Sequence, residues 1–193
     1  MFGFNKKKPM IEGPIEFEAE VEIDRPASEV FPLIDITDPR FRQRQFGAEV
    51  KAEDGSDNRF IMTVETFDDA VFHFEVLEHV EGQRQKCRAK MVPQLFALVQ
   101  SIEDYTIEPR GENACCLKLV TSAEFDPELS VEEVAEEVTM MSLAVNGDLA
   151  KVKVFAEEGL EAAKAMEEAM NGLEFDFDLG EIDIEWDDIE PEQ

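Results

Sequence analysis

Basic residues are scarce in this chain. Lys and Arg together number 18 against 46 Asp and Glu, so the 193 residues carry a formal net charge of −28. A field of this sign repels phosphate backbones. The one basic run near a terminus, Lys6 to Lys8, is expected on a chain end rather than in a binding patch. The composition therefore predicts no nucleic-acid partner.

Cysteine is rare as well. The three cysteines, two of them adjacent at Cys115 and Cys116, form no disulfide framework and no Cys/His spacing typical of a metal site. The sequence also lacks the P-loop, the GxGxxG fingerprint, the GxSxG elbow and a Ser-His-Asp pattern. We therefore expect reduced thiols, no metal, no cofactor and no catalytic residue that a motif identifies.

Long apolar runs are missing. The longest uninterrupted apolar stretch, residues 95–99, is far too short to span a bilayer, and residues 1–9 lack the apolar core of a signal peptide. The hydrophobic content of 44% is nevertheless enough for one domain with its own core. These features predict a cytoplasmic protein without a membrane span.

Apolar and acidic residues alternate without exception from Ile15 to Asp24. A period of two is typical of a β-strand with one wet face. Two short helices are expected next, at 27–36 and 40–46, because Pro26 and the Asp38-Pro39 pair interrupt the chain. Six further strands with tight turns between them follow, at 48–53, 59–67, 70–80, 83–92, 101–109 and 114–125. Short turns join antiparallel neighbours, so the pattern predicts an α+β fold with a curved antiparallel sheet of about six to seven strands.

One of these strands carries a basic stripe. Four basic residues share a single face of the segment 83–92, namely Arg84, Lys86, Arg88 and Lys90. We expect them to pair across strands with neighbouring acidic residues on the wet face, rather than to form an anion-binding patch.

A long amphipathic helix is predicted from Ser130 to about Ala169. Its apolar residues follow a three-then-four spacing that makes one stripe, with Val131, Val134, Val138, Met141, Val145, Leu149, Val152, Ala156 and Ala163. Ser130 and Glu133 form a capping box at its start. The 146–148 segment, Asn-Gly-Asp, and Gly159 are the points where this helix could bend or end.

Three segments resemble motifs of the START-like, or SRPBCC, superfamily, which includes polyketide cyclases and the birch-pollen allergen family. Residues 21–31, Val-Glu-Ile-Asp-Arg-Pro-Ala-Ser-Glu-Val-Phe, resemble its first-strand-to-helix signature. Residues 105–109, Tyr-Thr-Ile-Glu-Pro, are similar to the start of its penultimate hairpin, and residues 148–159 to the close of its C-terminal helix. In this order they cover residues 14 to 166.

The resemblance implies a helix-grip fold, in which the curved sheet wraps around the long C-terminal helix and two short helices follow the first strand. It also implies a deep cavity between sheet and helix for a lipid, a polyketide or an aromatic compound. It implies no particular activity. We therefore expect binding or carriage of a small hydrophobic or amphipathic ligand, with a cyclase or aromatase of the polyketide cyclase/dehydrase type as the alternative.

The inward faces of this fold supply candidate ligand-binding residues. The apolar candidates are Phe60, Met62 and Val64 on one strand, Phe72 and Phe74 on the next, and Met140 and Met141 on the long helix. Methionine and phenylalanine suit an adaptable apolar pocket, and they would equally well fill a closed core.

The polar candidates are Tyr105, Arg42 and Arg44, which could orient a ligand carboxylate or phenol. The alternative makes Tyr105 a hydrogen-bonded core residue and leaves both arginines in solvent. His73 is expected on the surface, and no role is expected for His79.

The chain divides into an N-terminal tail (1–13), a START-like ligand-binding domain (14–168) and an acidic-hydrophobic C-terminal tail (169–193). The C-terminal tail alternates apolar with acidic residues and has no Lys or Arg. Such alternation is typical of segments that fold on a partner. We expect residues 170–190 to dock on this chain, on a second copy in a homodimer or on another protein, and a protein-interaction module acting through this tail is a further functional alternative.

Overall fold

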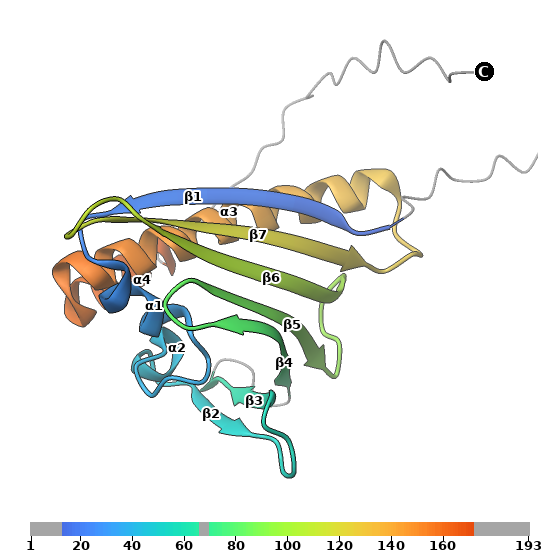
Figure 1. Cartoon of the computed structure of the whole chain (residues 1–193). Coiled ribbons are helices and arrows are strands. Elements are labelled where there is room, and N and C mark those ends of the chain that lie inside the picture. Colours follow the sequence, from blue (N-terminus) through green and yellow to red (C-terminus); the bar gives the residue numbers. More distant parts are fainter. Residues whose placement is uncertain (1–12, 66–69, 172–193) are drawn as a thin grey trace, which may run out of the picture.

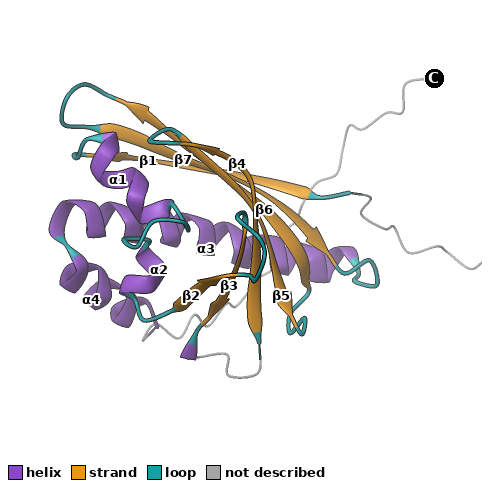
Figure 2. Ribbon diagram, turned by 60° about the horizontal axis from the view of Figure 1, so that its bottom comes forward, coloured by secondary structure: helices purple, strands orange, loops and turns teal. Residues whose placement is uncertain are grey.

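A computed structural model describes residues 13–65 and 70–171, and these form a seven-stranded antiparallel sheet with helices on its concave side (Figures 1 and 2). The strands are β1 (Ile15–Ile23), β2 (Glu49–Ala52), β3 (Arg59–Thr63), β4 (Val71–Val80), β5 (Arg84–Val92), β6 (Leu98–Pro109) and β7 (Cys115–Phe125). They lie in the order β1-β7-β6-β5-β4-β3-β2. Strands β2 to β7 thus form a meander, and the first strand of the chain pairs with the last.

The alternation predicted for the first strand is confirmed in β1. Its acidic residues are exposed and its apolar residues are buried or half-buried. It pairs with β7 from Ile15 opposite Ala123 to Ile23 opposite Cys115. The inward face of β7 is almost fully buried along its length, through Cys115, Leu117, Leu119, Thr121 and Ala123.

The described residues also form four helices: α1 (Ala27–Ile34), α2 (Arg42–Gln45), α3 (Val131–Glu158) and α4 (Leu160–Asn171). The predicted capping box at the start of α3 is present, because the Ser130 side chain accepts from the Glu133 backbone N–H and the Glu133 carboxylate accepts from the Ser130 N–H. The α3 stripe packs along β1, β7 and α1, with Val145, Leu149 and Val152 buried. Figure 2 shows the sheet curving over this helix. The predicted α+β helix-grip fold is therefore confirmed.

The prediction of a single long helix from 130 to 169 is wrong in one respect, because this segment forms two helices that are separated at Gly159. Gly159 has a φ of 95°, which favours glycine, and its N–H donates to the Phe155 carbonyl to close α3. The helix continues without a break through the 146–148 segment. There Gly147 leaves room for Met170 of α4, because a Cβ on Gly147 would lie 2.9 Å from the Met170 methyl group.

Several strand ends differ from the predicted ones. The strand predicted at 59–67 ends at Thr63, and the strand predicted at 101–109 begins at Leu98. The register between β6 and β7 shifts between Leu98 and Gln100. The irregularity lies where Leu98 and Val99, the end of the apolar 95–99 segment, enter the sheet, and sequence periodicity gave no indication of a strand there.

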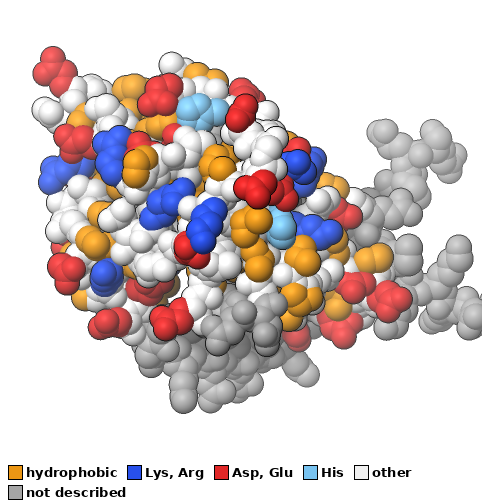
Figure 3. Space-filling model, turned by 90° about the horizontal axis from the view of Figure 1, so that it is seen from below, with side chains coloured by type: hydrophobic (Ala, Val, Ile, Leu, Met, Phe, Trp, Pro, Cys, Tyr) orange, Lys and Arg blue, Asp and Glu red, His pale blue; other side chains and the backbone are white. Residues whose placement is uncertain are grey.

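Three of the four residues of the β5 basic stripe pair with acidic side chains as predicted, and the fourth, Lys90, borders the cavity described below. Arg84 contacts Asp104 through two N–H groups, at 2.7 and 2.6 Å, and Lys86 reaches the same carboxylate at 3.2 Å. Arg88 pairs with Glu75 on β4. On the face of the molecule seen in Figure 3, basic side chains likewise lie beside acidic ones. Among the described residues no helix has the combination of length and apolarity that crossing a membrane requires.

Candidate functional site

A cavity of about 410 Å³ lies between the concave face of the sheet and α3. Its wall is mainly apolar, and this part includes Met62, Val64, Phe72, Phe74, Met91, Leu95, Phe96, Leu98, Val99, Leu119, Met141 and Val145. Polar residues gather on one part of the wall, with Arg42, Ser101, Glu103, Tyr105, Thr121 and Asp148. Leu95 and Phe96 are half exposed, so the cavity meets solvent near the β5–β6 connection. Both its volume and its lining are typical of small-molecule sites.

The structure brings seven of the ten predicted binding residues to this wall. They are Arg42, Met62, Val64, Phe72, Phe74, Tyr105 and Met141. Contact of these residues with a ligand stays a prediction.

The other three predicted residues lie elsewhere. Phe60 packs in a core cluster with Ile36 and Phe41 and is not part of the cavity wall. Met140 is 53% exposed on α3, because it is rotated about 100° from Met141, which faces the cavity. Arg44 donates to the backbone carbonyls of Val50 and Ile36, and these contacts hold α2 against the start of β2.

Arg42 is the centre of a buried hydrogen-bonded network. Its Nε donates to Asp148 Oδ1 at 3.2 Å, and its Nη2 donates to Asp148 Oδ2 at 2.5 Å and to the Tyr105 hydroxyl at 2.9 Å. Its Nη1 donates to the Leu33 carbonyl at 3.4 Å. The Tyr105 hydroxyl in turn donates to Asp148 Oδ2 at 3.1 Å. The guanidinium charge is therefore balanced inside the protein.

This network shows where the structure places two of the polar candidates, Arg42 and Tyr105, while their contact with a ligand stays a prediction. Tyr105 is a hydrogen-bonded core residue, 5% exposed, and Arg42 is not in solvent, being 6% exposed. Burial alone would lower the pKa of Arg42, yet the Asp148 carboxylate and its hydrogen bonds raise it above the usual value. For Tyr105 burial has the opposite effect, because it disfavours the charged phenolate and so raises the pKa of the hydroxyl well above its usual value. Arg42 and Tyr105 therefore remain a cation and a neutral phenol at physiological pH.

Glu103 and Thr121 are polar wall residues to which sequence analysis assigned no role. Glu103 lies between Cys87 of β5 and Thr121 of β7 in one cross-strand row, and it shares its face with Tyr105 two residues later. Burial first, and then the Asp148 charge, raise the pKa of Glu103 to about 7, against the opposing effects of Arg42 and Ser101. Burial, with Glu103 nearby, raises the pKa of the Cys87 thiol to about 12. The period of two along β6, counted from Tyr105, was the signal that could have identified Glu103.

Thr121 is the second polar wall residue to which sequence analysis assigned no role. Its side-chain oxygen is buried and has no hydrogen-bond partner among the described residues. An unpaired buried hydroxyl is unfavourable by about 1–3 kcal/mol, so its place on the cavity wall needs an explanation.

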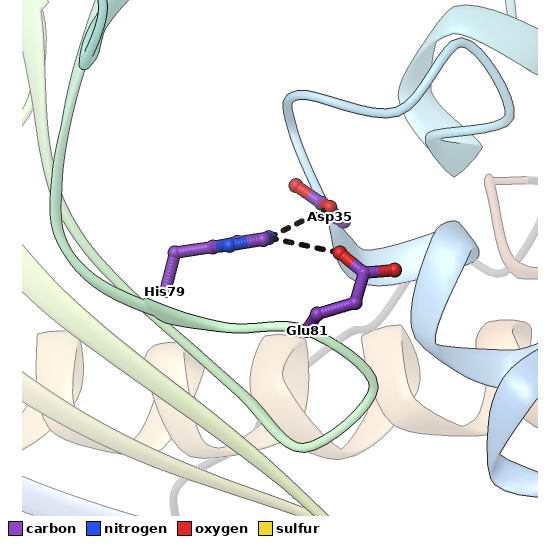
Figure 4. A group of neighbouring side chains, drawn as sticks. All are labelled: Asp35, His79 and Glu81. Carbon is purple, nitrogen blue, oxygen red and sulfur yellow. Dashed lines mark hydrogen bonds and ion pairs between the residues drawn. The ribbon is translucent and has the colours of Figure 1, made fainter.

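A second polar cluster joins the turn after α1 to the far end of β4 (Figure 4). The Asp35 carboxylate is 3.0 Å from His79 Nε2, and it also accepts from Gln85 at 2.6 Å and from Thr37. With Glu81, these groups place one nitrogen and two carboxylate oxygens within 4.8 Å of one another. The hydrogen bonds to Asp35 account for its burial, so the cluster is explained as a clamp between α1 and the sheet.

The expectation of no role for His79 is therefore wrong, and a β-bulge explains why. The register between β4 and β5 shifts between Val76 and Glu78. One extra residue reverses the face on which each later side chain lies. His79 thus lies opposite Gln85 on the concave side, where strict alternation would have placed it with His73.

His79→Ala should lower the free energy of unfolding by about 1–2 kcal/mol, because the buried Asp35 carboxylate loses one hydrogen-bonding partner. Chemical denaturation measures this loss. His73→Ala is the matched control on the same strand, with an expected change within about 0.5 kcal/mol. Equal losses in the two variants would contradict the clamp.

Comparison with known proteins gives matches at the level of structure. No family model and no curated protein matches the chain. Among solved structures, DynU16 from the dynemicin biosynthetic locus superposes with a TM-score of 0.52 at 18% identity, over 72% of this chain and 46% of that one. The di-domain ARO/CYC protein BexL from the BE-7585A biosynthetic pathway gives 0.55 at 16% identity, over 72% and 45%. The Zhui aromatase/cyclase from Streptomyces sp. R1128 gives 0.51 at 12% identity, over 74% and 93%.

These matches agree with the fold that the sequence motifs predicted. The chain spans less than half the length of DynU16 and of BexL. At these identities the likeness concerns the fold alone.

Proposed function

We propose that the protein binds and carries a small hydrophobic or amphipathic molecule in the cavity between the sheet and α3. The observation that carries this proposal is the wall itself, which joins a broad apolar surface to a compact polar group. Methionine and phenylalanine side chains on β3, β4 and α3 can repack around ligands of different shapes. The polar group supplies the few oriented contacts that give such sites their specificity.

A cavity-filling substitution tests the proposal. Ala89 is buried on the concave face of β5 and lines the cavity, so Ala89→Phe should occupy part of the ligand's volume. We expect the fluorescent apolar probe N-phenyl-1-naphthylamine to bind the wild-type protein and to lose about tenfold or more of its affinity in this variant, which corresponds to about 1.4 kcal/mol.

Ala52→Phe is the matched control, because Ala52 is an exposed strand residue on β2 outside the cavity wall. It should leave probe affinity unchanged. Native mass spectrometry of protein from its own host, followed by extraction, would identify the natural ligand. An absence of probe binding together with a mass that never exceeds that of the bare chain would contradict the proposal.

An aromatase/cyclase-type enzyme is the second candidate, and Glu103 is the observation that favours it. A carboxyl group with a pKa of about 7 on a cavity wall can exchange a proton near neutral pH. Conversion of a poly-β-ketone thioester into a cyclised product by the wild-type protein, lost in a folded Glu103→Gln variant, would establish this candidate. The tail proposed as a docking segment, residues 170–190, lies outside the described residues except for its first two.

A further inference from the structure

Two polar groups on the cavity wall have hydrogen-bonding capacity left for a ligand. Glu103 and Thr121 lie directly opposite each other on β6 and β7, so their Cβ atoms are roughly 4.5–5.5 Å apart on one face of the sheet. Thr121 is 2% exposed, and its side-chain oxygen has no hydrogen-bond partner in the part of the chain that the structure describes. The Glu103 carboxylate lies next to it on the cavity wall, and a carboxylate offers several acceptor positions.

The neighbouring Arg42 does not offer an equivalent site for an anion. Four N–H donations of its guanidinium already go to Asp148, Tyr105 and the Leu33 carbonyl. Asp148 neutralises its charge, so an ionised Glu103 leaves the buried group of Arg42, Asp148 and Glu103 with one net negative charge. Lys90, the other charged residue of the cavity wall, is exposed to solvent. A ligand carboxylate placed here would meet a like charge in a poorly solvated site.

The Thr121 hydroxyl and the acceptor positions of Glu103 that its hydrogen bond with Ser101 leaves over define a complementary ligand. An acceptor beside a hydroxyl that can donate is matched by a ligand hydroxyl, which gives one hydrogen bond and receives another. An ammonium group could donate to both residues but would leave the Thr121 O–H without an acceptor. We propose that the cavity selects an apolar molecule bearing an uncharged hydroxyl group, which donates to Glu103 and accepts from Thr121.

This inference rests on the proposed binding function and adds the chemical class of the ligand. It also predicts the effect of pH. Because the pKa of Glu103 is raised to about 7, the wall gains negative charge as pH rises through neutrality. Discrimination against carboxylate ligands should therefore be strongest at alkaline pH and weaken as Glu103 takes up its proton.

Four probes on one ring system test the proposal: naphthalene, 2-naphthol, 2-naphthoate and 2-naphthylmethylamine. Their dissociation constants are measured by calorimetry at about pH 8. We expect 2-naphthol to bind about tenfold more tightly than naphthalene, as a hydrogen bond to a charged group predicts, and 2-naphthoate to bind more weakly than naphthalene.

Two variants locate the preference in the structure. In Glu103→Gln and in Thr121→Val the ratio of 2-naphthol to naphthalene affinity should fall to within about threefold. Thr121→Val removes one of the two hydrogen bonds, and Glu103→Gln replaces the charged acceptor of the other by a neutral amide oxygen, which forms a weaker bond. Glu108→Gln removes the same charge from the same strand at an exposed position outside the cavity wall, and it should keep the full ratio.

Each other outcome has a distinct meaning. If naphthalene binds, and 2-naphthoate binds as tightly as 2-naphthol or more tightly, the hydroxyl preference is overturned and the proposed binding function stays intact. A 2-naphthol ratio unchanged in both variants, or tighter binding of the amine than of 2-naphthol, would also overturn it. Failure of all four probes to bind would overturn the binding function and this inference together.

Discussion

Asp148→Ala should destabilise the protein by about 3–5 kcal/mol, the largest effect of any single substitution proposed here. The reason is the partner it leaves behind. Arg42 is almost fully buried and donates two hydrogen bonds to Asp148, so the substitution leaves a guanidinium charge in the interior without its hydrogen-bonded counter-ion. At roughly 2–4 °C per kcal/mol for a chain of this size, the melting temperature should fall by about 6–20 °C.

A matched control is Glu75→Ala on β4. Glu75 also pairs with an arginine, Arg88, but both side chains are well exposed. Exposed ion pairs contribute about 0–1 kcal/mol, so this variant should remain close to the wild type in denaturant titrations. A loss of similar size at both positions would contradict the importance of burial.

Removing the whole network should cost less than removing Asp148 alone. The triple variant Arg42→Met, Tyr105→Phe and Asp148→Leu replaces all three polar side chains by apolar ones of similar size, and leaves none of these groups unpaired. Such replacements of buried ion networks are often neutral or stabilising. A triple variant less stable than Asp148→Ala would show that the network is needed for more than its own charge balance.

Glu103→Gln should stabilise the protein at alkaline pH and have little effect near pH 4.5. The pKa of Glu103 is about 7 in the folded protein against a usual 4.5. Between these values the folded state holds a proton that the unfolded chain has released, so this group reduces stability as pH rises from 4.5 to 7. Above pH 7 its full cost is present, roughly 3 kcal/mol at most.

The measurement is the difference in unfolding free energy between Glu103→Gln and the wild type, taken from about pH 4.5 to pH 8. It should rise through this range and level off above pH 7. Glu108→Gln, the exposed glutamate on the same strand, should give a small difference without this rise. A flat profile for Glu103→Gln would mean that its carboxyl group is solvated in the folded protein.

Local patterns predicted most of the fold. The alternation in β1, the turn residues between strands and the capping box of α3 each depend on neighbouring residues, and each is present in the structure. The same patterns, together with the cavity that the START-like resemblance implied, selected five apolar candidates that lie on the cavity wall, Met62, Val64, Phe72, Phe74 and Met141. Features that depend on the two-residue period of a strand or on the three-to-four-residue period of a helix could therefore be predicted from the sequence.

The polar groups of the site depend on contacts that local patterns do not contain. Asp148 is separated from Arg42 by 106 residues, and no pattern in either segment indicates that they meet. His79 was missed because a single bulge at Leu77 reverses the alternation of β4, and bulges have no strong sequence signal. Met140 lies one helical step from Met141, and the orientation of α3 over the sheet decides which of the two faces the cavity.

The pairing of β1 with β7 has a consequence for the nascent chain. These partners are about a hundred residues apart in sequence, since Ile15 lies opposite Ala123. At synthesis rates of roughly 5–20 residues per second, β1 leaves the ribosome on the order of 5–20 seconds before its partner exists. During that interval its four glutamates, at every second position, repel the same strand of neighbouring copies on a polysome. The acidic face that β1 exposes to solvent in the finished sheet thus also opposes the association of unpaired β1 strands before β7 is synthesised.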